Sequence, residues 1–290
     1  MRWTPGRRSV NLEDRRGQRM TGGGLGLGGG GFGRMGLGGL VVVIILSIVF
    51  KQDFLGLLGG AGAGTGTDVV EGPVASTPEE ERQVEFVSFV LDDAQANWTR
   101  IFASAGQQYQ PATLVLYRDA TQTACGFGQA ASGPFYCPGD AKVYVDLGFF
   151  DELHSQYGAT GDFAQAYVLA HEIGHHVQSL LGTERDVRRL QSGDPRNANA
   201  LSVRMELQAD CYAGIWARST EQHDILERGD VDEGLAAAAA VGDDRLQRMG
   251  GGRVNPDAFT HGSSEERMRW FQQGFSGGEL RSCDTFADLR

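Results

Sequence analysis

The stretch LAHEIGHHVQ, residues 169–178, contains three of the six histidines in this 290-residue chain. Its surroundings predict a helix over residues 163–181, and Gly182 is a typical residue to end that helix. His171 and His175 are four residues apart, so in a helix their side chains lie on one face, one turn apart. Two imidazoles in this arrangement can bind the same metal ion.

The motif HEIGH also contains a carboxylate, because Glu172 directly follows the first histidine. Zinc hydrolases use this pattern: the two histidines bind the metal, and the glutamate is the general base that takes a proton from water. Zinc is the expected ion, although manganese or iron would fit similar ligands. A solvated polar helix face is the alternative interpretation. His176 is rotated by about 100° from His175 around the helix, so we assign it no ligand role.

A catalytic zinc ion needs a third protein ligand and an open position for water. The segment RMELQADCYAG lies in a second predicted helix and places Glu206 and Asp210 four residues apart. That helix is otherwise largely apolar, so two carboxylates on it require a buried partner, which a cation supplies. We interpret Glu206 as the third ligand and Asp210 as the acceptor that orients a ligand histidine, with His171 as the first candidate. Asp210 as a direct ligand and an ordinary acidic helix face are the alternatives.

Length and composition predict a chain with a substantial core. The net charge of −11 argues against a nucleic-acid-binding surface.

Residues 112–119 and 142–146 have the β-branched and aromatic composition of strands, while most of the remaining pattern up to the C-terminus is helical. We therefore expect an α+β domain over residues 77–290, with a small sheet first and helices after it. Helices are expected over residues 78–102, 163–181, 199–218 and 232–249, and from residue 263 onward.

The first 76 residues differ in composition from the rest. Residues 1–34 contain seven arginines but only two acidic residues, and residues 35–50 are uncharged and almost wholly apolar. We interpret residues 35–58 as one transmembrane signal anchor, with a core short of the about 20 residues that a span needs, and residues 59–76 as a flexible linker. A buried core helix and a cleaved signal peptide are the alternatives.

The charge distribution predicts the orientation of this anchor. Arginines before a span place the N-terminus in the cytoplasm, so residues 1–34 would be a basic, glycine-rich cytoplasmic arm. The domain that follows would then lie outside the cytoplasm, in a single-pass cell membrane protein.

Four cysteines, an even set without CxxC spacing, argue against a zinc knuckle. In an oxidising compartment they would pair, and four cysteines allow three connectivities. Cys125–Cys137 is the most local choice, and it leaves Cys211–Cys283. Each bridge would contribute about 3 kcal/mol. Free buried thiols are the alternative.

Several stretches carry a resemblance to a known family: MRW and NLEDRRG near the start, CGFGQAASGPFYCPGDAKVYVDLGFF, LAHEIGHHVQ, ELQADCYAG, VGDDRLQ, FTHGSSEER and CDTF. Through them the chain resembles the bacterial putative neutral zinc metallopeptidase family over nearly all its length outside the glycine-rich stretches. HEIGH followed by ELQAD also resembles the gluzincin arrangement, in which the later helix supplies a glutamate ligand and a supporting aspartate. The resemblance implies a zincin-like peptidase fold. The glycine-rich tract and the short span depart from the family and bear on the anchor alone.

The resulting expectation is a membrane-anchored zinc endopeptidase acting on a peptide or protein substrate. One Zn²⁺ would be held by His171, His175 and Glu206, with Glu172 as base. His261, in FTHGSSEER, would stabilise the oxyanion, or would be an inert loop histidine. Residues 143–146 would be either a cleft-edge strand that takes an extended peptide or a core strand. A zinc-binding scaffold with little activity is the alternative function, and the sequence indicates no oligomeric state.

Overall fold

The computed structural model describes all residues except 7, 22–67, 130–132 and 290. The chain divides into two compact units, one made of Met1–Gly17 with Pro73–Arg290 and the other of Gln18–Gly72. The larger unit contains the sheet, the helices and the residues of the HEIGH and ELQAD motifs. It is a mixed α+β fold, which confirms the predicted class at that level.

The described residues of the smaller unit form two short strands. β2 (Gln18–Thr21) pairs with β3 (Asp68–Glu71) in an antiparallel ladder that places Thr21 opposite Asp68. β3 lies in the stretch predicted as a flexible linker. The predicted membrane-spanning residues 35–58 lie outside the described residues, and no helix in the described part of the chain is long and apolar enough to cross a membrane.

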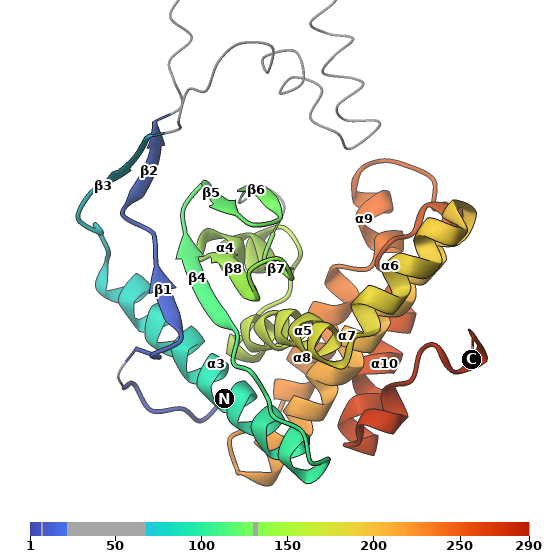
Figure 1. Cartoon of the computed structure of the whole chain (residues 1–290). Coiled ribbons are helices and arrows are strands. Elements are labelled where there is room, and N and C mark those ends of the chain that lie inside the picture. Colours follow the sequence, from blue (N-terminus) through green and yellow to red (C-terminus); the bar gives the residue numbers. More distant parts are fainter. Residues whose placement is uncertain (7, 22–67, 130–132, 290) are drawn as a thin grey trace, which may run out of the picture. The chain divides into compact units, whose positions relative to one another are not determined.

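The main sheet has the strand order β1-β4-β8-β7 (Figure 1). β4 (Thr113–Tyr117) and β8 (Lys142–Asp146) are the two predicted strands, and they run parallel to each other. β7 (Phe135–Cys137) pairs antiparallel with β8, and a separate hairpin of β5 (Ala120–Thr123) and β6 (Gly126–Gln129) connects β4 to this region. Four of the five residues of β4 are buried, so the centre of the sheet belongs to the core.

The fourth strand of the sheet comes from the N-terminal arm. β1 (Leu12–Asp14) pairs in parallel with β4. Beside it the guanidinium group of Arg16, 3% exposed, forms ion pairs with Asp14, Glu80 and Glu81 at 2.7–3.0 Å. These contacts differ from the predicted division, in which residues 1–34 form a separate arm, because a buried arginine and a paired strand join the first 17 residues to the domain.

The backbone amine of Met1 also belongs to the larger unit. It lies 2.8 Å from Asp162 and 3.3 Å from Asp230, and its neighbourhood includes Glu227 and Glu233. Asp162 is the first residue of the helix that carries HEIGH. The N-terminal ammonium group therefore supplies positive charge to an acidic cluster at the start of that helix.

The first long helix, α3 (Pro78–Ser104), begins as its sequence predicts. The hydroxyl group of Thr77 accepts a hydrogen bond from the backbone N–H of Glu80, which satisfies one free donor of the first turn. The Glu80 carboxylate accepts hydrogen bonds from Arg118 and Ser76. The glutamate in the predicted capping-box position thus serves to connect α3 to the end of β4.

Helix α5 (Asp162–Leu181) lies between the sheet and the C-terminal helices (Figure 1). It contacts β7 and β8 on one side and α7 (Ala198–Gln222) and α8 (Asp230–Ala240) on the other. A Cβ atom on Gly174 would come within 3.0 Å of the backbone of Ala209, so the glycine inside HEIGH allows α5 and α7 to approach closely.

Helix α10 (Ser264–Gly277) packs against α7, and glycine again allows the approach. A Cβ atom on Gly274 would overlap the carbonyl of Cys211. The predicted capping box of α10 is formed, with Ser263 and Glu266 as its two members. The other elements among the described residues are α4 (Gly148–Ser155), α6 (Thr183–Gly193), η2 (Pro195–Asn197), η3 (Pro256–Ala258), η4 (Leu280–Cys283) and η5 (Ala287–Leu289).

The helix predicted over residues 232–249 is two helices, so that prediction was wrong. α8 ends at Ala240, and α9 (Asp243–Met249) begins after a break at Val241 and Gly242. A Cβ atom on Gly242 would overlap the backbone of Ser264, so the chain passes close to the start of α10 at this point. The break also brings Asp243 to the loop that precedes α10.

Candidate metal centre

The three predicted ligands come together from two packed helices. One ligand atom from each of His171, His175 and Glu206 lies within 4.8 Å of the other two. His171 Nε2 is 3.1 Å from Glu206 Oε2, and His175 Nε2 is 3.5 Å from Glu206 Oε1. Two imidazole nitrogens and one carboxylate thus converge on one point, which is a donor set that fits a zinc ion with an open position.

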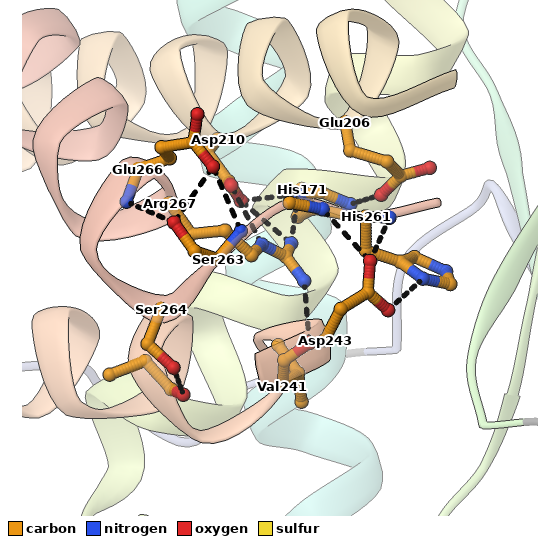
Figure 2. A network of polar contacts seen from close by, with 12 residues as sticks. His171, Glu206, Asp210, Val241, Asp243, His261, Ser263, Ser264, Glu266 and Arg267 are labelled. Carbon is orange, nitrogen blue, oxygen red and sulfur yellow. Dashed lines mark hydrogen bonds and ion pairs between the residues drawn. The ribbon is translucent and has the colours of Figure 1, made fainter. Parts of the chain in front are cut away.

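Asp210 supports the first histidine from the other side of its ring, as Figure 2 shows. Its Oδ1 atom lies 2.8 Å from His171 Nδ1, and its two oxygens also accept hydrogen bonds from Arg267 (2.8 and 2.9 Å) and from the hydroxyl group of Tyr167. Asp210 is fully buried. A carboxylate with these donors accepts the Nδ1–H of His171 and leaves the Nε2 lone pair directed at the cluster.

The electrostatics of the cluster favour a cation. Burial by itself would lower the pKa of His171, but the carboxylates of Asp210 and Glu206 outweigh it and raise this pKa to about 10. Burial likewise opposes ionisation of Glu206, yet the neighbouring histidines hold its pKa well below the usual range. Without a metal, protons would occupy the position where positive charge is favoured. Metal binding there would release them.

The cluster opens into a cavity of about 590 Å³. Glu172 lines this cavity beside the two histidines and is 7% exposed, so its carboxylate is largely shielded from solvent. The lining is of mixed character, with a charged side formed by the cluster and by Arg267. An apolar side includes Tyr157, Val168, Val241 and Leu246. The cavity therefore has room for a substrate next to the convergent polar groups.

His261 reaches the same cavity from the loop before α10. Its Nδ1 atom lies 3.3 Å from Asp243 Oδ1, and the other oxygen of Asp243 accepts backbone hydrogen bonds from residues 260–262 at 2.6–3.0 Å (Figure 2). Burial opposes ionisation of Asp243, but its hydrogen bonds with His261 and with this backbone lower its pKa. An ionised Asp243 therefore holds both the loop and the histidine ring.

Residues 143–146 are not the edge of the cleft. β8 lies between β4 and β7, and Val143, Tyr144 and Val145 are buried, so the core-strand alternative holds. Among the described strands of this sheet, β7 is the one at the end next to α5. Phe135 and Tyr136 of β7 line the cavity. The edge strand beside the cluster is therefore β7, which the sequence analysis did not predict.

His176 points away from the cluster and towards the sheet. Its Nε2 atom lies 2.6 Å from the backbone oxygen of Gln110, and its Nδ1 atom lies 3.1 Å from the hydroxyl group of Tyr136. Burial lowers the pKa of His176, so the ring is neutral near pH 7. A neutral ring donates from Nε2 to the carbonyl and accepts from the tyrosine. The third histidine of the motif connects α5 to the sheet.

Both cysteine pairs form disulfides, Cys125–Cys137 and Cys211–Cys283, and no free cysteine remains in the described part of the chain. Cys211 directly follows Asp210 on α7, so the second disulfide lies close to the cluster along the chain. It joins α7 to η4 near the C-terminus.

The sequence interpretation missed three residues that hold the cluster, Arg267, Tyr167 and Gln178. It also missed Asp243, which holds His261. For Tyr167 and Gln178 a local signal existed, since they lie four residues before His171 and three after His175 on one helix. Arg267 and Asp243 come from other elements, and helix periodicity alone does not assign them a partner.

Comparison with known proteins identifies the family of the chain. The family described as putative neutral zinc metallopeptidase matches residues 1–286. An uncharacterized protein of Escherichia coli (strain K12), YpfJ, is 46% identical over 291 residues, which cover 99% of each chain. An uncharacterized protein of Mycobacterium tuberculosis (strain ATCC 25618 / H37Rv), Rv2575, is 46% identical over 187 residues, which cover 60% of this chain and 62% of that one. No solved structure matches the chain. With the family pattern extending from the first residue almost to the last, the chain belongs to the putative neutral zinc metallopeptidase family.

Proposed function

We propose that this protein is a zinc-dependent metallopeptidase that hydrolyses peptide bonds within a peptide or protein substrate. The observation that carries the proposal is the convergence of His171, His175 and Glu206 within 4.8 Å, at a cavity that Glu172 also lines. Three protein ligands with an open position are typical of catalytic zinc, whereas structural zinc is usually enclosed by four.

The histidines and Glu206 would hold the zinc ion. Zinc bound by such ligands supplies Lewis acidity, which makes water a better nucleophile near neutral pH and polarises a carbonyl group. Asp210 would orient His171, because its carboxylate accepts the Nδ1 proton. Its other contacts, with Arg267 and Tyr167, favour this supporting role over direct ligation.

Glu172 would act as the general base and acid. It would take a proton from the attacking water and deliver it to the departing amine, as a carboxylate within hydrogen-bond reach can do. His261 would donate a hydrogen bond to the oxygen of the carbonyl as negative charge develops there. Asp243 supports that role by holding the ring through Nδ1. Donation from Nε2 then requires a ring that carries protons on both nitrogens.

The substrate would bind as an extended strand along β7. An edge strand offers backbone N–H and C=O groups that pair with a peptide regardless of its sequence. Phe135 and Tyr136 would contact substrate side chains, since both line the cavity. This mode of binding suits cleavage in the interior of a chain, because the peptide continues past the strand in both directions.

The two disulfides support a location outside the cytoplasm, where thiols are oxidised. We retain residues 35–58 as a proposed membrane anchor, but as a segment that enters and leaves the bilayer on the same side and not as a single crossing. Met1–Gly17 contributes a strand and a buried arginine to the catalytic unit. A cytoplasmic N-terminus with an external domain would require those contacts to break, so we propose that both lie on one side of the membrane.

Glu172→Gln tests the proposed function. The variant should bind zinc in a one-to-one ratio like the wild type, because the three ligands are unchanged. Its rate of peptide hydrolysis should fall by about 10²–10⁴-fold, the usual contribution of a general base. Metal analysis of the purified protein and cleavage of a broad peptide library give both values. Wild-type protein that binds zinc but cleaves no peptide would instead support the zinc-binding scaffold.

A further inference from the structure

The second histidine of the motif is held by a chain of hydrogen bonds that contains no charged group. His175 Nδ1 lies 2.8 Å from Gln178 Oε1. Gln178 Nε2 donates to the backbone oxygen of Met205 at 2.7 Å and to Gln208 Oε1 at 3.1 Å. Gln208 Nε2 in turn donates to the backbone oxygen of Cys283 at 3.0 Å.

The direction of this chain follows from the two backbone carbonyls, which can only accept. Because the oxygens of Met205 and Cys283 accept, the amide nitrogens of both glutamines must face them. Gln178 Oε1 is then the atom that faces His175, and it too can only accept. His175 must carry its proton on Nδ1, and its Nε2 lone pair is left for the metal.

Burial of both glutamines fixes the orientation of their amide groups. Gln178 is 0% exposed and Gln208 is 4% exposed, so water cannot replace a lost partner without a rearrangement of the core. A buried amide with a reversed orientation would place two carbonyl oxygens against each other and leave its donors unsatisfied. The backbone oxygen of Cys283, at one end of this series of hydrogen bonds, therefore fixes the proton of His175 on Nδ1 at the other end.

The acceptor at the far end is held by a covalent bond. Cys283 is bonded to Cys211, which lies three residues after Gln208 on α7 and hence on the same face of that helix. The disulfide and the hydrogen bond from Gln208 thus join the same short helix, η4, to the same face of α7.

We propose that Gln178 and Gln208 are positioning residues that keep His175 in its metal-binding tautomer, and that the Cys211–Cys283 disulfide fixes the chain of hydrogen bonds at its far end. The proposal rests on the zinc site proposed above. It implies that the oxidation state of this cysteine pair sets how tightly the protein retains zinc, although neither cysteine is one of the proposed ligands.

The first test measures zinc affinity of the full-length protein against a competing chelator. Gln178→Leu should weaken zinc binding by about 10–100-fold, the usual effect of removing a partner of a ligand histidine. Gln178→Glu keeps an acceptor opposite His175 but loses both donors, so it should weaken binding less than Gln178→Leu. Gln165→Leu, the same change on the outer part of the same helix, should bind zinc like the wild type.

These variants separate positioning from a general structural role. If Gln178 mattered only for packing α5 against α7, the glutamate variant would be as weak as the leucine variant. Thermal unfolding of the zinc-free proteins shows which variants are folded. A folded Gln178→Leu protein with wild-type zinc affinity would overturn the positioning role.

The second test is a double-mutant cycle on the disulfide. Cys211→Ser with Cys283→Ser removes the bond without leaving thiols that could bind zinc, and it should speed the loss of zinc to the chelator. Adding Gln208→Leu to the serine pair should speed zinc loss little further, because both changes break the same series of hydrogen bonds. Additive effects, or no effect of the serine pair, would overturn the link to the disulfide.

Failure of this inference is distinguishable from failure of the proposed function. If wild-type protein binds no zinc, the metal site itself is wrong. If wild-type protein binds zinc and the glutamine variants bind it equally well, the site stands and only the positioning chain is refuted.

Discussion

At the scale of single residues, the candidate site depends on buried charges that balance one another. Asp210 and Arg267 are both almost completely buried and form two hydrogen bonds with parallel geometry, one to each carboxylate oxygen. Arg267 holds the pKa of Asp210 below its usual range, although burial opposes this. The Asp210 carboxylate therefore stays ionised in the core because Arg267 of α10 pairs with it there.

Arg267→Met tests that balance. Removal of the cation leaves a buried carboxylate without its partner, which should lower the free energy of unfolding by about 3–5 kcal/mol. Urea unfolding of the zinc-free protein measures the change. Arg269→Met is the matched control, because Arg269 is exposed on the same helix and should change stability by less than about 0.5 kcal/mol. Equal effects of the two substitutions would contradict the pairing.

At the scale of elements, α5 contacts α7 on one side and the sheet on the other. Its His171 and His175 face α7, while His176 faces the sheet and bonds to Gln110 and Tyr136. A rotation of about 100° per residue gives adjacent histidines these different partners. The helix can thus present the proposed metal ligands on one side while the same motif anchors it to the sheet on the other.

His176→Phe should separate these two roles. The substitution keeps a ring of similar size but leaves the Gln110 carbonyl and the Tyr136 hydroxyl group without a partner. The free energy of unfolding should fall by about 1–3 kcal/mol, while zinc content stays unchanged. Loss of zinc from a folded variant would show that His176 belongs to the metal site.

The same variant has a predictable dependence on pH. Burial lowers the pKa of His176 from 6.5, so the neutral ring contributes stability above that pH. This contribution is lost as the pH falls through the lowered pKa, because the folded protein resists protonation of the ring. The difference in unfolding free energy between wild type and His176→Phe should therefore shrink on acidification. A difference that grows would contradict a buried neutral ring.

At the scale of the whole molecule, the first 17 residues are part of the larger compact unit. β1 extends the sheet, and the buried Arg16 pairs with Glu80 and Glu81 of α3. In the smaller unit, the pairing of β2 with β3 brings Thr21 next to Asp68. The two ends of the segment between these residues therefore lie next to each other.

This arrangement predicts that the arm and the domain are accessible from the same side of a membrane. Val10 and Val254 are both exposed, one in the arm and one in the loop after α9, and the native cysteines are paired in disulfides. Val10→Cys and Val254→Cys should both react, or both fail to react, with a maleimide that cannot cross membranes, when added to intact cells. Labelling of one position alone would restore the single-pass orientation.

Local chemistry in the sequence determined much of this protein. The spacing of His171, His175, Glu206 and Asp210 was readable because residues four apart on a helix share a face wherever that helix packs. Local sequence also indicated the strands at residues 113–117 and 142–146, the capping box at Ser263 and the most local cysteine pair. Each depends on the order of nearby residues.

Only the tertiary structure decided which distant groups complete these local patterns. Arg267 reaches Asp210 from α10, Gln208 reaches Cys283, and the break at Gly242 brings Asp243 to His261. The arginine-rich start was read as an arm because exposed and buried arginines are identical in sequence. What distinguishes them is the set of carboxylates that folding places around each, since a buried charge is tolerated only where the packed chain supplies its partner.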